Sequence, residues 1–513
     1  MAMDSRTKTS ASGDREPQRA IVIGGGLGGL TAAACLAAKG LNVQLFEKNQ
    51  RLGGKLNVFT QDGFTFDLGP SILTLPQVFR DTFECARRNM DDYLTIQSVR
   101  PHWRNFFEDG TVLDLDPDPA VMREELQKAG PGLAQEYQSF LDYSRQQYEL
   151  IEPAYFRQGL ETVPQLLNHY KHRVLKLSSL TTMDRAVRRR LSNQYLRDIF
   201  AFFIKYVGSS ATRAPGFMNL LPHIQFGYGL WYVRGGMYNL AAGLERLLDD
   251  LGVQVHTNTE VTRILTRDGQ ATGIEAGNEV FDAEWVISNM EVIPAYKNLL
   301  DEDDHFMRKL DKFEPACSGL VIHLGVNRRY EQLAHHNFFY SANQREHFRS
   351  VFEKKELPDD PTLYVVAPAR TNPEVAPEGQ DNIKVLPHIP YLNDNHPYTH
   401  DDYMQLKDRV LQKLEHMGLV DLRKHVVTEH IWTPHDIERM YYSNGGSIYG
   451  VVSDLWKNYA LKAPKQSNKY DNLYFVGGST NPGGGMPMVS LSGQLTARAI
   501  TRRLCPESQP EKE

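Results

Sequence analysis

The sequence predicts an α/β fold, in which a parallel sheet covered by helices is combined with a mixed α+β part. Three segments indicate this fold class. Residues 19–38 read as an apolar strand, a glycine-rich turn and an alanine-rich helix. The same order of strand, glycine turn and helix returns after Trp231 and again after Asn472. Because such units add parallel strands to a sheet, the three segments predict one sheet assembled from distant parts of the chain.

The first unit has the spacing of a dinucleotide site. Gly24, Gly26 and Gly29 form a G-x-G-x-x-G pattern, which allows a tight turn, close approach of the backbone to a pyrophosphate, and close packing of helix on strand. The N–H groups that start the helix face the phosphates. Glu47 ends the second strand, 23 residues after Gly24, where a carboxylate binds ribose hydroxyls. The unit therefore predicts a Rossmann-type site for FAD or NAD, and the carboxylate disfavours the 2′-phosphate of NADP.

The later units extend this domain. After Gly235 and Gly236 we expect a helix with its leucines on one face, then strands at 253–257, 261–266, 273–275 and 284–289. Near the end of the chain we expect a strand at 473–476 and a helix at 491–500. The predicted dinucleotide-binding domain thus consists of 19–95, 231–300 and 456–505. A mainly helical region, 96–230, and a mixed substrate region, 301–455, interrupt it.

Composition excludes several classes of function. The 513 residues carry a net charge of only −6 and no basic block with interleaved aromatics, so we expect no nucleic-acid partner. The four cysteines, Cys35, Cys85, Cys317 and Cys505, are scattered without metal-ligand spacing. This pattern argues against a metal site and a disulfide framework, and it favours a reducing cytoplasm.

One stretch has the length of a membrane span. Residues 20–38 form 19 consecutive uncharged positions, but five of them are glycines in the strand–turn–helix pattern. Residues 1–18 are polar, without the features of a signal or transit peptide, and read as a disordered tail, as do 506–513. We therefore expect a cytoplasmic protein that does not cross a membrane.

Longer motifs carry a resemblance to a known family. IVIGGGLGGL, RLGGK, DLGPSILTLP, GLWYVRGGMYNLA, VISNMEVIP and LYFVGGSTNPGGGMP span residues 19–505. Together they resemble the bacterial carotenoid desaturase and oxidase family of phytoene desaturase-like flavoproteins, near its C30 branch. Within that branch, FIKYVGSS, LAHHNFFY, LPDDPTLYVV and NIKVLPHIPY look more like the oxygenases that convert a terminal methyl to an aldehyde than like the paralogous desaturases.

The resemblance implies a glutathione reductase/amine oxidase-like fold and a cofactor, FAD. It also extends the cofactor site beyond the first glycine turn, because a second Gly-Gly with a basic residue wraps the diphosphate in this family. Spacing and resemblance together assign to FAD the residues Gly24, Gly25, Gly26, Leu27, Gly28, Gly29, Glu47, Lys48, Arg51, Gly53, Gly54, Lys55, Gly69, Pro70, Ser71, Val261, Asn289, Gly477, Gly478, Met488 and Val489.

The implied reaction is oxidation of the terminal methyl group of a C30 carotenoid, 4,4′-diaponeurosporene or 4,4′-diapolycopene, to an aldehyde. Hydride loss to flavin followed by addition of water is one route, and activation of O2 by reduced flavin is another. A C30 desaturase and a flavin-bearing carotenoid carrier without turnover are the alternatives. No side chain is assigned as catalytic. Weak candidates for moving protons, although residues of these types more often have a structural role, are His335, His336, His388, Tyr391 and Tyr449.

A C30 hydrocarbon dissolves in the bilayer, so the enzyme is expected to associate peripherally with the inner face of the cell membrane. A basic cluster, Lys171, Arg173, Lys176, Arg185, Arg188, Arg189 and Arg190, precedes an apolar run at 199–204. This pattern suits an anionic lipid surface, but a solvated helix beside a buried core helix explains it equally well. The sequence leaves a homo-oligomer open.

Overall fold

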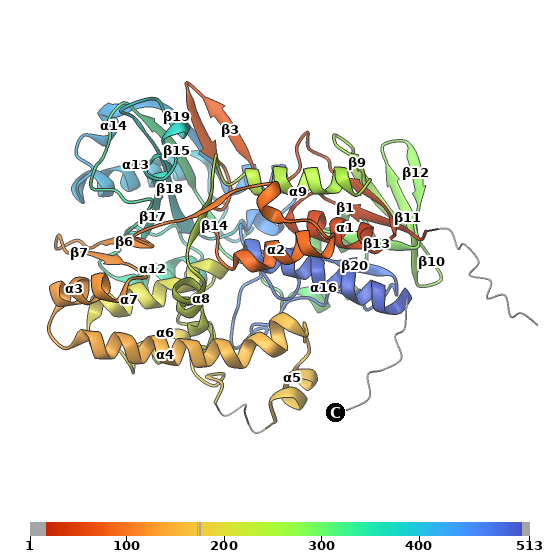
Figure 1. Cartoon of the computed structure of the whole chain (residues 1–513), viewed down its shortest axis with the longest axis horizontal. Coiled ribbons are helices and arrows are strands. Elements are labelled where there is room, and N and C mark those ends of the chain that lie inside the picture. The colour runs from red at the N-terminus through yellow and green to blue at the C-terminus, as the bar shows by residue number, and fades with distance from the viewer. Residues whose placement is uncertain (1–16, 172, 174–175, 505–513) are drawn as a thin grey trace, which may run out of the picture.

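A computed structural model describes residues 17–171, 173 and 176–504 (Figure 1). Its central sheet has five strands, all paired in parallel, in the order β20 (Leu473–Phe475), β13 (Trp285–Ser288), β1 (Arg19–Ile23), β2 (Asn42–Phe46) and β9 (Gln254–His256). The strands come from the start, the middle and the end of the chain. The sheet is therefore assembled from distant segments, including the strands before the first and third glycine turns. The strand before the second glycine turn, β8 (Trp231–Val233), is not part of it, because it pairs antiparallel with β5 (Ile96–Ser98) in a separate two-stranded sheet, so this part of the prediction is wrong.

Helices cover one face of this sheet. Helix α1 (Leu27–Ala37) packs against α9 (Asn239–Asp250) and against α16 (Met486–Leu504), which also contacts α2 (Pro76–Cys85). The packing of α1 on α16 is close, because a Cβ at Gly493 would lie 2.5 Å from the Gly28 carbonyl oxygen. Helix α16 starts earlier than the predicted residue 491, because Pro487 suits the first turn of a helix. An antiparallel sheet, β10 (Val261–Arg267), β11 (Gln270–Ala276) and β12 (Glu279–Asp282), extends from the domain.

A second, larger sheet lies beside this domain. Its order is β19 (Val426–Trp432), β15 (Val321–Val326), β18 (Asp381–Ile389), β17 (Leu363–Val366), β16 (His336–Phe339), β6 (Trp103–Phe106) and β7 (Val112–Leu115), and β14 (Ser318–Gly319) pairs with β18. Helix α13 (His400–His416) buries Leu406, Val410 and Leu414 against one face. The other face turns its aromatic side chains toward the helical layer.

Strands β6 and β7 differ from the mainly helical pattern expected for 96–230. Trp103 is fully buried, with its ring 4.2 Å from that of Phe203 and 4.5 Å from that of Phe338. Alternating burial and pairing with β16, more than 200 residues away in sequence, stabilise this segment as a strand.

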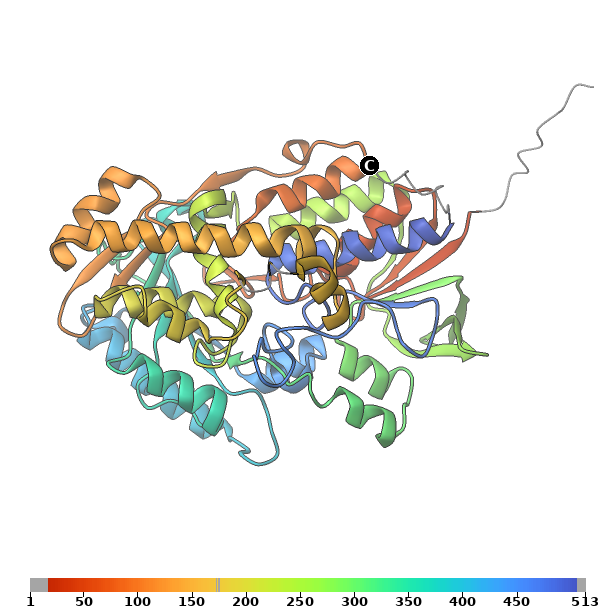
Figure 2. The same cartoon turned by 90° about the horizontal axis from the view of Figure 1, so that it is seen from below.

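The rest of the middle region forms the helical layer. It contains α3 (Pro119–Ala129), α4 (Leu133–Ile151), α5 (Val163–Tyr170), α6 (Met183–Arg188), α7 (Gln194–Phe202) and α8 (Leu221–Tyr228), with the turns η2 (Glu152–Arg157), η4 (Phe203–Val207) and η5 (Gly216–Leu220). Seen from below, the long orange-yellow helix α4 runs across this layer toward α5 (Figure 2). All six residues of the apolar run 199–204 are buried. This run is a core helix, and the interpretation of it as a lipid-facing segment is wrong.

The remaining elements are short. They are β3 (Val58–Gln61), β4 (Phe64–Asp67), β5 (Ile96–Ser98), β8 (Trp231–Val233), α10 (Val292–Asn298), α11 (Asp304–Met307), α12 (Gln344–Arg349), α14 (Leu422–His425), α15 (Pro434–Tyr441), η1 (Met90–Asp92), η6 (Arg308–Leu310), η7 (Ser350–Lys354), η8 (Pro368–Arg370), η9 (Pro373–Val375) and η10 (Asn444–Gly446). Among the helices of the described residues, none has both the length and the apolar character of a bilayer span.

Candidate active site

The glycine turn between β1 and α1 is held from behind by Asn289, which follows β13. The Asn289 Oδ1 atom accepts a hydrogen bond of 3.2 Å from the Gly29 N–H. A Cβ at Gly26 would lie 2.5 Å from Asn289 Nδ2, and one at Gly29 would lie 2.2 Å from the Gly24 carbonyl oxygen. The glycines are therefore required by the close packing of this turn, in addition to any pyrophosphate that approaches it.

Glu47 is buried at the end of β2 and has a structural role as well as the predicted one. Its carboxylate accepts hydrogen bonds from the Gly25 N–H at 2.8 Å, the Asn49 N–H at 2.9 Å and Asn49 Nδ2 at 2.8 Å. These bonds connect the glycine turn to the loop after β2. The carboxylate therefore helps to hold the glycine turn in place, besides being available to bind a ligand.

A cavity of about 600 Å³ opens at the carboxyl ends of the parallel strands. Most of the residues that the sequence assigned to FAD line it: Gly24, Gly26, Leu27, Gly28, Glu47, Lys48, Gly53, Gly54, Lys55, Gly69, Pro70, Val261, Asn289, Gly477, Gly478 and Val489. We call it the dinucleotide cavity. Gly25 and Gly29 lie behind its wall, where they donate to Glu47 and Asn289. Arg51 donates to the Val58 carbonyl and lines no cavity described here.

These residues fit a bound dinucleotide. The amino end of α1 reaches the cavity through the backbone of Gly26, Leu27 and Gly28, and the amino end of α16 reaches it through Gly485 and Met486. Both helix ends can stabilise negative charge, on the diphosphate at α1 and on a reduced flavin ring at α16.

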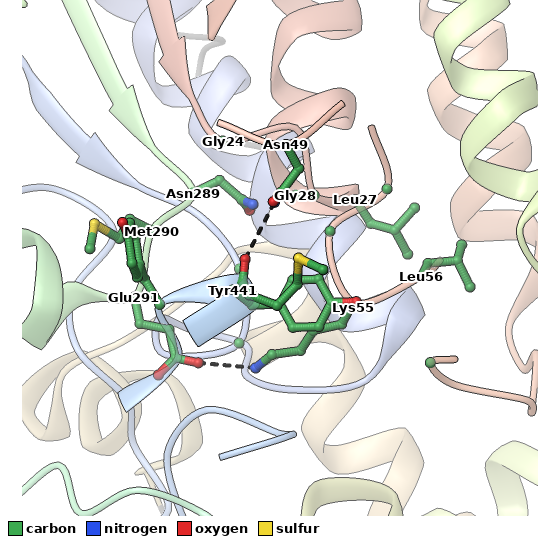
Figure 3. A pocket seen from close by; sticks show the side chains of 18 of the residues that line it. Gly24, Leu27, Gly28, Asn49, Lys55, Leu56, Asn289, Met290, Glu291 and Tyr441 are labelled. Atoms are coloured by element: carbon green, nitrogen blue, oxygen red, sulfur yellow. Dashed lines mark hydrogen bonds and ion pairs between the residues drawn. The ribbon is translucent and has the colours of Figure 1, made fainter. Parts of the chain in front are cut away.

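Lys55 and Glu291 face one another in this cavity (Figure 3). Lys55 Nζ lies 3.2 Å from Glu291 Oε1 and donates at 2.8 Å to the Ser447 carbonyl. The sequence assigned Lys55 but missed Glu291, although it lies only two residues after Asn289. Tyr441 and Lys384 also line the cavity, but they come from the far region of the chain and carried no local signal.

A second cavity, of about 520 Å³, is lined mainly by apolar side chains. We call it the apolar cavity. It meets the dinucleotide cavity, because seven residues border both: Gly69, Pro70, Lys384, Leu386, Tyr449, Gly485 and Met486. Ser71 and Met488, which the sequence assigned to FAD, line the apolar cavity and not the dinucleotide cavity. A ligand in one cavity can therefore reach a ligand in the other.

Lys384 fixes the segment that separates the two cavities. Its Nζ donates to the Gly69 carbonyl at 2.5 Å and to the Asp67 carbonyl at 3.2 Å. The Asp67 carboxylate in turn accepts from the N–H groups of Met237 and Tyr238. Burial lowers the pKa of Lys384 to about 8, although the nearby Asp67 carboxylate opposes the shift.

Four of the candidate proton-transfer residues line neither cavity. His335 Nδ1 lies 2.6 Å from Thr371 Oγ1, and the Tyr364 hydroxyl lies 2.9 Å from His336 Nδ1. Tyr391 donates to Glu314 at 3.3 Å. Burial lowers the pKa values of His335 and His388 to about 3, which keeps both neutral. His336 and His388 lie on the same face of the large sheet as Tyr364 and Leu386, which line the apolar cavity, but they do not line it themselves. Only Tyr449 borders both cavities, and burial raises its pKa well above the ordinary value.

The apolar cavity reaches the surface among exposed apolar side chains. The exposed fractions are 92% for Leu180, 68% for Trp456, 64% for Tyr459, 55% for Leu167 and 42% for Val163, and all five line the cavity. We call them the mouth residues.

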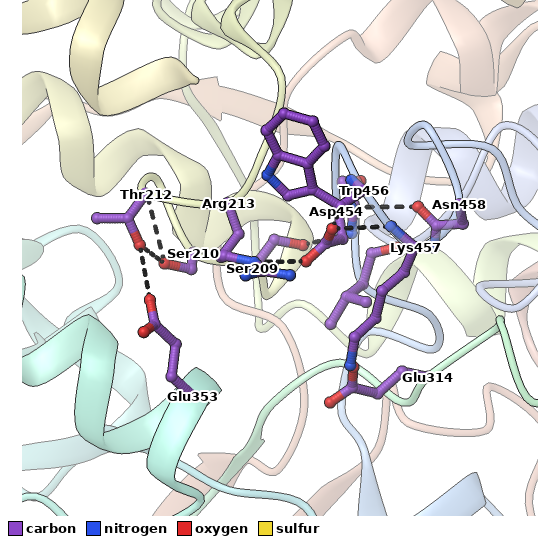
Figure 4. Close-up of polar contacts among 12 residues, drawn as sticks. Ser209, Ser210, Thr212, Arg213, Glu314, Glu353, Asp454, Trp456, Lys457 and Asn458 are labelled. Carbon is purple, nitrogen blue, oxygen red and sulfur yellow. Dashed lines mark hydrogen bonds and ion pairs between the residues drawn. The ribbon is translucent and has the colours of Figure 1, made fainter. Parts of the chain in front are cut away.

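The loop that bears Trp456 is anchored to the turn after η4 (Figure 4). Arg213 Nε lies 2.9 Å from Asp454 Oδ2, and the Ser453 N–H donates to Ser209 Oγ at 2.8 Å. Asp454 also accepts from the N–H groups of Trp456 and Lys457. The exposed indole is therefore carried by a fixed loop.

The basic cluster has mixed surroundings. Arg188 forms an ion pair of 2.9 Å with the buried Asp184, and the Arg190 guanidinium lies 3.7 Å from the centre of the Tyr143 ring. These two arginines stabilise the helical layer. Lys171, Arg173 and Lys176 are exposed in the segment between α5 and Leu180.

Comparisons with known proteins agree with this geometry. A 4,4′-diapolycopene oxygenase of Methylomonas sp is 55% identical over 95% of this chain and 99% of its own length. A 4,4′-diaponeurosporene oxygenase of Staphylococcus aureus (strain USA300) is 48% identical over 94% of this chain and 98% of its own.

Solved structures share the fold at low identity. An oxidoreductase from Methanosarcina mazei has a TM-score of 0.65 at 16% identity, covering 94% of this chain and 100% of its own. Wild-type putrescine oxidase bound to putrescine has a TM-score of 0.64 at 14% identity, covering 95% and 99%.

The sequence model of one protein family, the flavin-containing amine oxidoreductases, matches residues 27–501 of this chain. This match covers nearly the whole chain, from the start of α1 into α16. The protein is an oxidoreductase whose cofactor is FAD. The chain belongs to the family of flavin-containing amine oxidoreductases.

Proposed function

We propose that this enzyme oxidises the terminal methyl group of a C30 carotenoid, 4,4′-diaponeurosporene or 4,4′-diapolycopene, to an aldehyde. The observation that carries the proposal is the apolar cavity, which extends from exposed apolar residues to a border shared with the dinucleotide cavity. A long hydrocarbon fits such a cavity, since its walls offer dispersion contacts and little competition from water. Both relatives are named as oxygenases of C30 carotenoids, which supports this substrate class and favours oxidation over desaturation.

The chain's own residues bind and orient the reactants. Bound FAD supplies an oxidant that accepts a hydride from the substrate carbon. Lys384 holds the backbone of Asp67 and Gly69 at the border of the cavities, and Met486 begins α16 there. The apolar walls exclude bulk water from the carbon that is oxidised and present one end of the polyene to the border.

We also propose that the mouth residues dock on the inner face of the cell membrane. A hydrocarbon substrate partitions into the bilayer, and Trp and Tyr side chains prefer its interface. The exposed Lys171, Arg173 and Lys176 lie close in sequence to Leu167 and Leu180, where basic residues favour anionic lipid. The mouth residues, rather than the run at 199–204, are the surface that suits this role.

The activity is tested with the purified, FAD-loaded protein and either carotenoid in liposomes, with products identified by mass. Addition of oxygen supports the proposal. Loss of hydrogens without oxygen would instead indicate a desaturase, and unchanged carotenoid would indicate a carrier. The same preparation stripped of FAD is the control and should leave the carotenoid unchanged.

Membrane docking is tested by flotation with anionic liposomes. Replacing Leu180 and Trp456 by Ser should reduce the bound fraction, because it removes two exposed apolar contacts. The matched control replaces Val280 and Val420 by Ser, which are 60% and 57% exposed and line neither cavity. Equal binding of both double variants would contradict docking through the mouth.

A further inference from the structure

Lys205 is a buried amine with unusual surroundings. It lies in η4, is 4% exposed and lines the apolar cavity. The other buried lysines of the described chain, Lys384, Lys462 and Lys465, each donate to oxygen atoms. For Lys205 Nζ, no hydrogen bond or ion pair occurs within the described residues. Burying a polar group without such a partner costs free energy, so the presence of this amine here points to a functional role.

Four aromatic rings surround this amine. Lys205 Nζ lies 4.3 Å from the ring centre of Tyr364, 4.5 Å from that of Tyr206, 4.7 Å from that of Phe338 and 4.9 Å from that of Trp103. The desolvated site favours the neutral amine, while the ring faces stabilise an ammonium once a proton has arrived. The site is therefore suited to accept a proton and hold it briefly.

The other titratable groups that face Lys205 do not compete for this role. They are the phenols of Tyr206, which is partly buried, and Tyr364, and the imidazoles of His336 and His388, which are buried as Tyr364 is. Burial raises the pKa values of both phenols and lowers those of both imidazoles, so all four stay neutral. Burial also lowers the pKa of Lys205 well below its ordinary value.

Lys205 lies toward the cofactor end of the apolar cavity. Gly208, in the same turn, packs directly on Tyr449, since a Cβ there would lie 2.3 Å from the Tyr449 ring. Tyr449 borders both cavities. Tyr364, whose ring contacts the amine, pairs in the sheet with Leu386, which also borders both cavities, whereas Leu180 and Trp456 mark the exposed end.

We propose that Lys205 is the general base that takes the hydroxyl proton when the terminal alcohol is oxidised to the aldehyde. This inference rests on the proposed function, in which the methyl group passes through an alcohol. As the C=O bond forms, the C–H hydride leaves the carbon for the oxidised flavin, and the O–H proton passes to the neutral Lys205 amine. The resulting ammonium lies among the four rings and returns its proton to water after the product leaves.

Lys205→Met tests the step, because Met keeps the shape of the side chain and removes the base. With the terminal alcohol supplied in liposomes, we expect aldehyde formation to slow by about 10²-fold or more. With the carotenoid supplied, we expect the alcohol to accumulate. Ethylamine added to Lys205→Ala should restore part of the rate, in proportion to the neutral amine present. Lys205→Arg keeps a charge within the rings but cannot accept a proton, so it should remain slow.

Three results would overturn the proposal. They are a wild-type ratio of aldehyde to alcohol in Lys205→Met, full activity in Lys205→Arg, and no response to the amine. If the wild-type enzyme adds no oxygen at all, the proposed function fails instead.

A stability measurement then still tests the amine itself. If folded Lys205 is neutral, the unfolding equilibrium constant of wild type relative to Lys205→Met should fall by up to tenfold per pH unit as the pH rises toward 10, because only the unfolded chain binds the proton. Parallel pH curves for the two proteins would show a protonated Lys205 and refute the proposal.

Discussion

Asn289→Asp should weaken FAD binding severely while preserving the shape of the turn. The substitution is isosteric, and the oxygen that accepts from the Gly29 N–H at 3.2 Å is kept. The other atom of the side-chain end, Nδ2, becomes a charged oxygen directly beside Gly26, where a Cβ would lie 2.5 Å away. The new charge therefore lies against the backbone that the diphosphate is expected to approach.

The size of the effect follows from Coulomb's law. A carboxylate about 5 Å from one phosphate charge is repelled by about 3 kcal/mol at an effective dielectric constant of about 20. This repulsion corresponds to a loss of affinity on the order of 10²-fold. The assay is titration of the apoprotein with FAD, followed by flavin fluorescence, with the retained flavin absorbance as a second measure.

Asn289→Ala is the matched control, since it removes the hydrogen bond without adding charge. We expect Asp to bind FAD more weakly than Ala, and to recover part of the difference at pH 5 as the carboxylate becomes protonated. Equal affinities of the Asp and Ala variants would refute the placement of the diphosphate beside Gly26 and Asn289.

Three further predictions concern the same scaffold. Gly29→Ala should give protein without flavin or without solubility, because its Cβ would lie 2.2 Å from the Gly24 oxygen. Gly110→Ala meets nothing within 4 Å and strains only its own turn, where φ is +85°, so it should lose some stability but keep its flavin. Glu47→Gln should lower the free energy of unfolding by about 1–3 kcal/mol, because an amide cannot accept from all three N–H donors, and an unchanged melting temperature would contradict this role. The triple variant in which Gln replaces Arg188, Arg189 and Arg190 should have a lower melting temperature, because it removes contacts within the helical layer, but its liposome flotation should stay near the wild-type level. A loss of flotation with an unchanged melting temperature would show that these arginines face lipid.

Local patterns predicted the parts of the fold that local chemistry determines. The strand, turn and helix around Gly24 were predicted because the G-x-G-x-x-G spacing is typical of a tight turn that joins a strand to a closely packed helix. The pairing of β6 with β16 could not be predicted in this way, because Trp103 and Phe338 meet only after more than 200 intervening residues have folded.

The same distinction applies to the candidate site. Residues near the glycine motifs, such as Lys55, line the dinucleotide cavity as expected. Most of the apolar cavity is lined by residues outside these motifs, so residue type alone could not show which polar groups line it. His335 and His336 were candidates because of their chemistry, but neither of them lines the dinucleotide cavity or the apolar cavity. Lys205 was not a candidate, since an isolated lysine in an apolar segment has no local signal of the four rings around it.

The order of the central sheet has a consequence for how the enzyme is made. Strand β20 and helix α16 leave the ribosome more than 400 residues after β1 and α1, yet Gly477 and Met486 complete the wall of the dinucleotide cavity. A nascent chain that has already produced β1 and α1 still lacks this wall for more than 400 residues of synthesis. The complete cavity therefore forms only after β20 and α16 have been synthesised, and a message truncated before residue 473 should yield protein that does not retain FAD, however intact its first glycine turn.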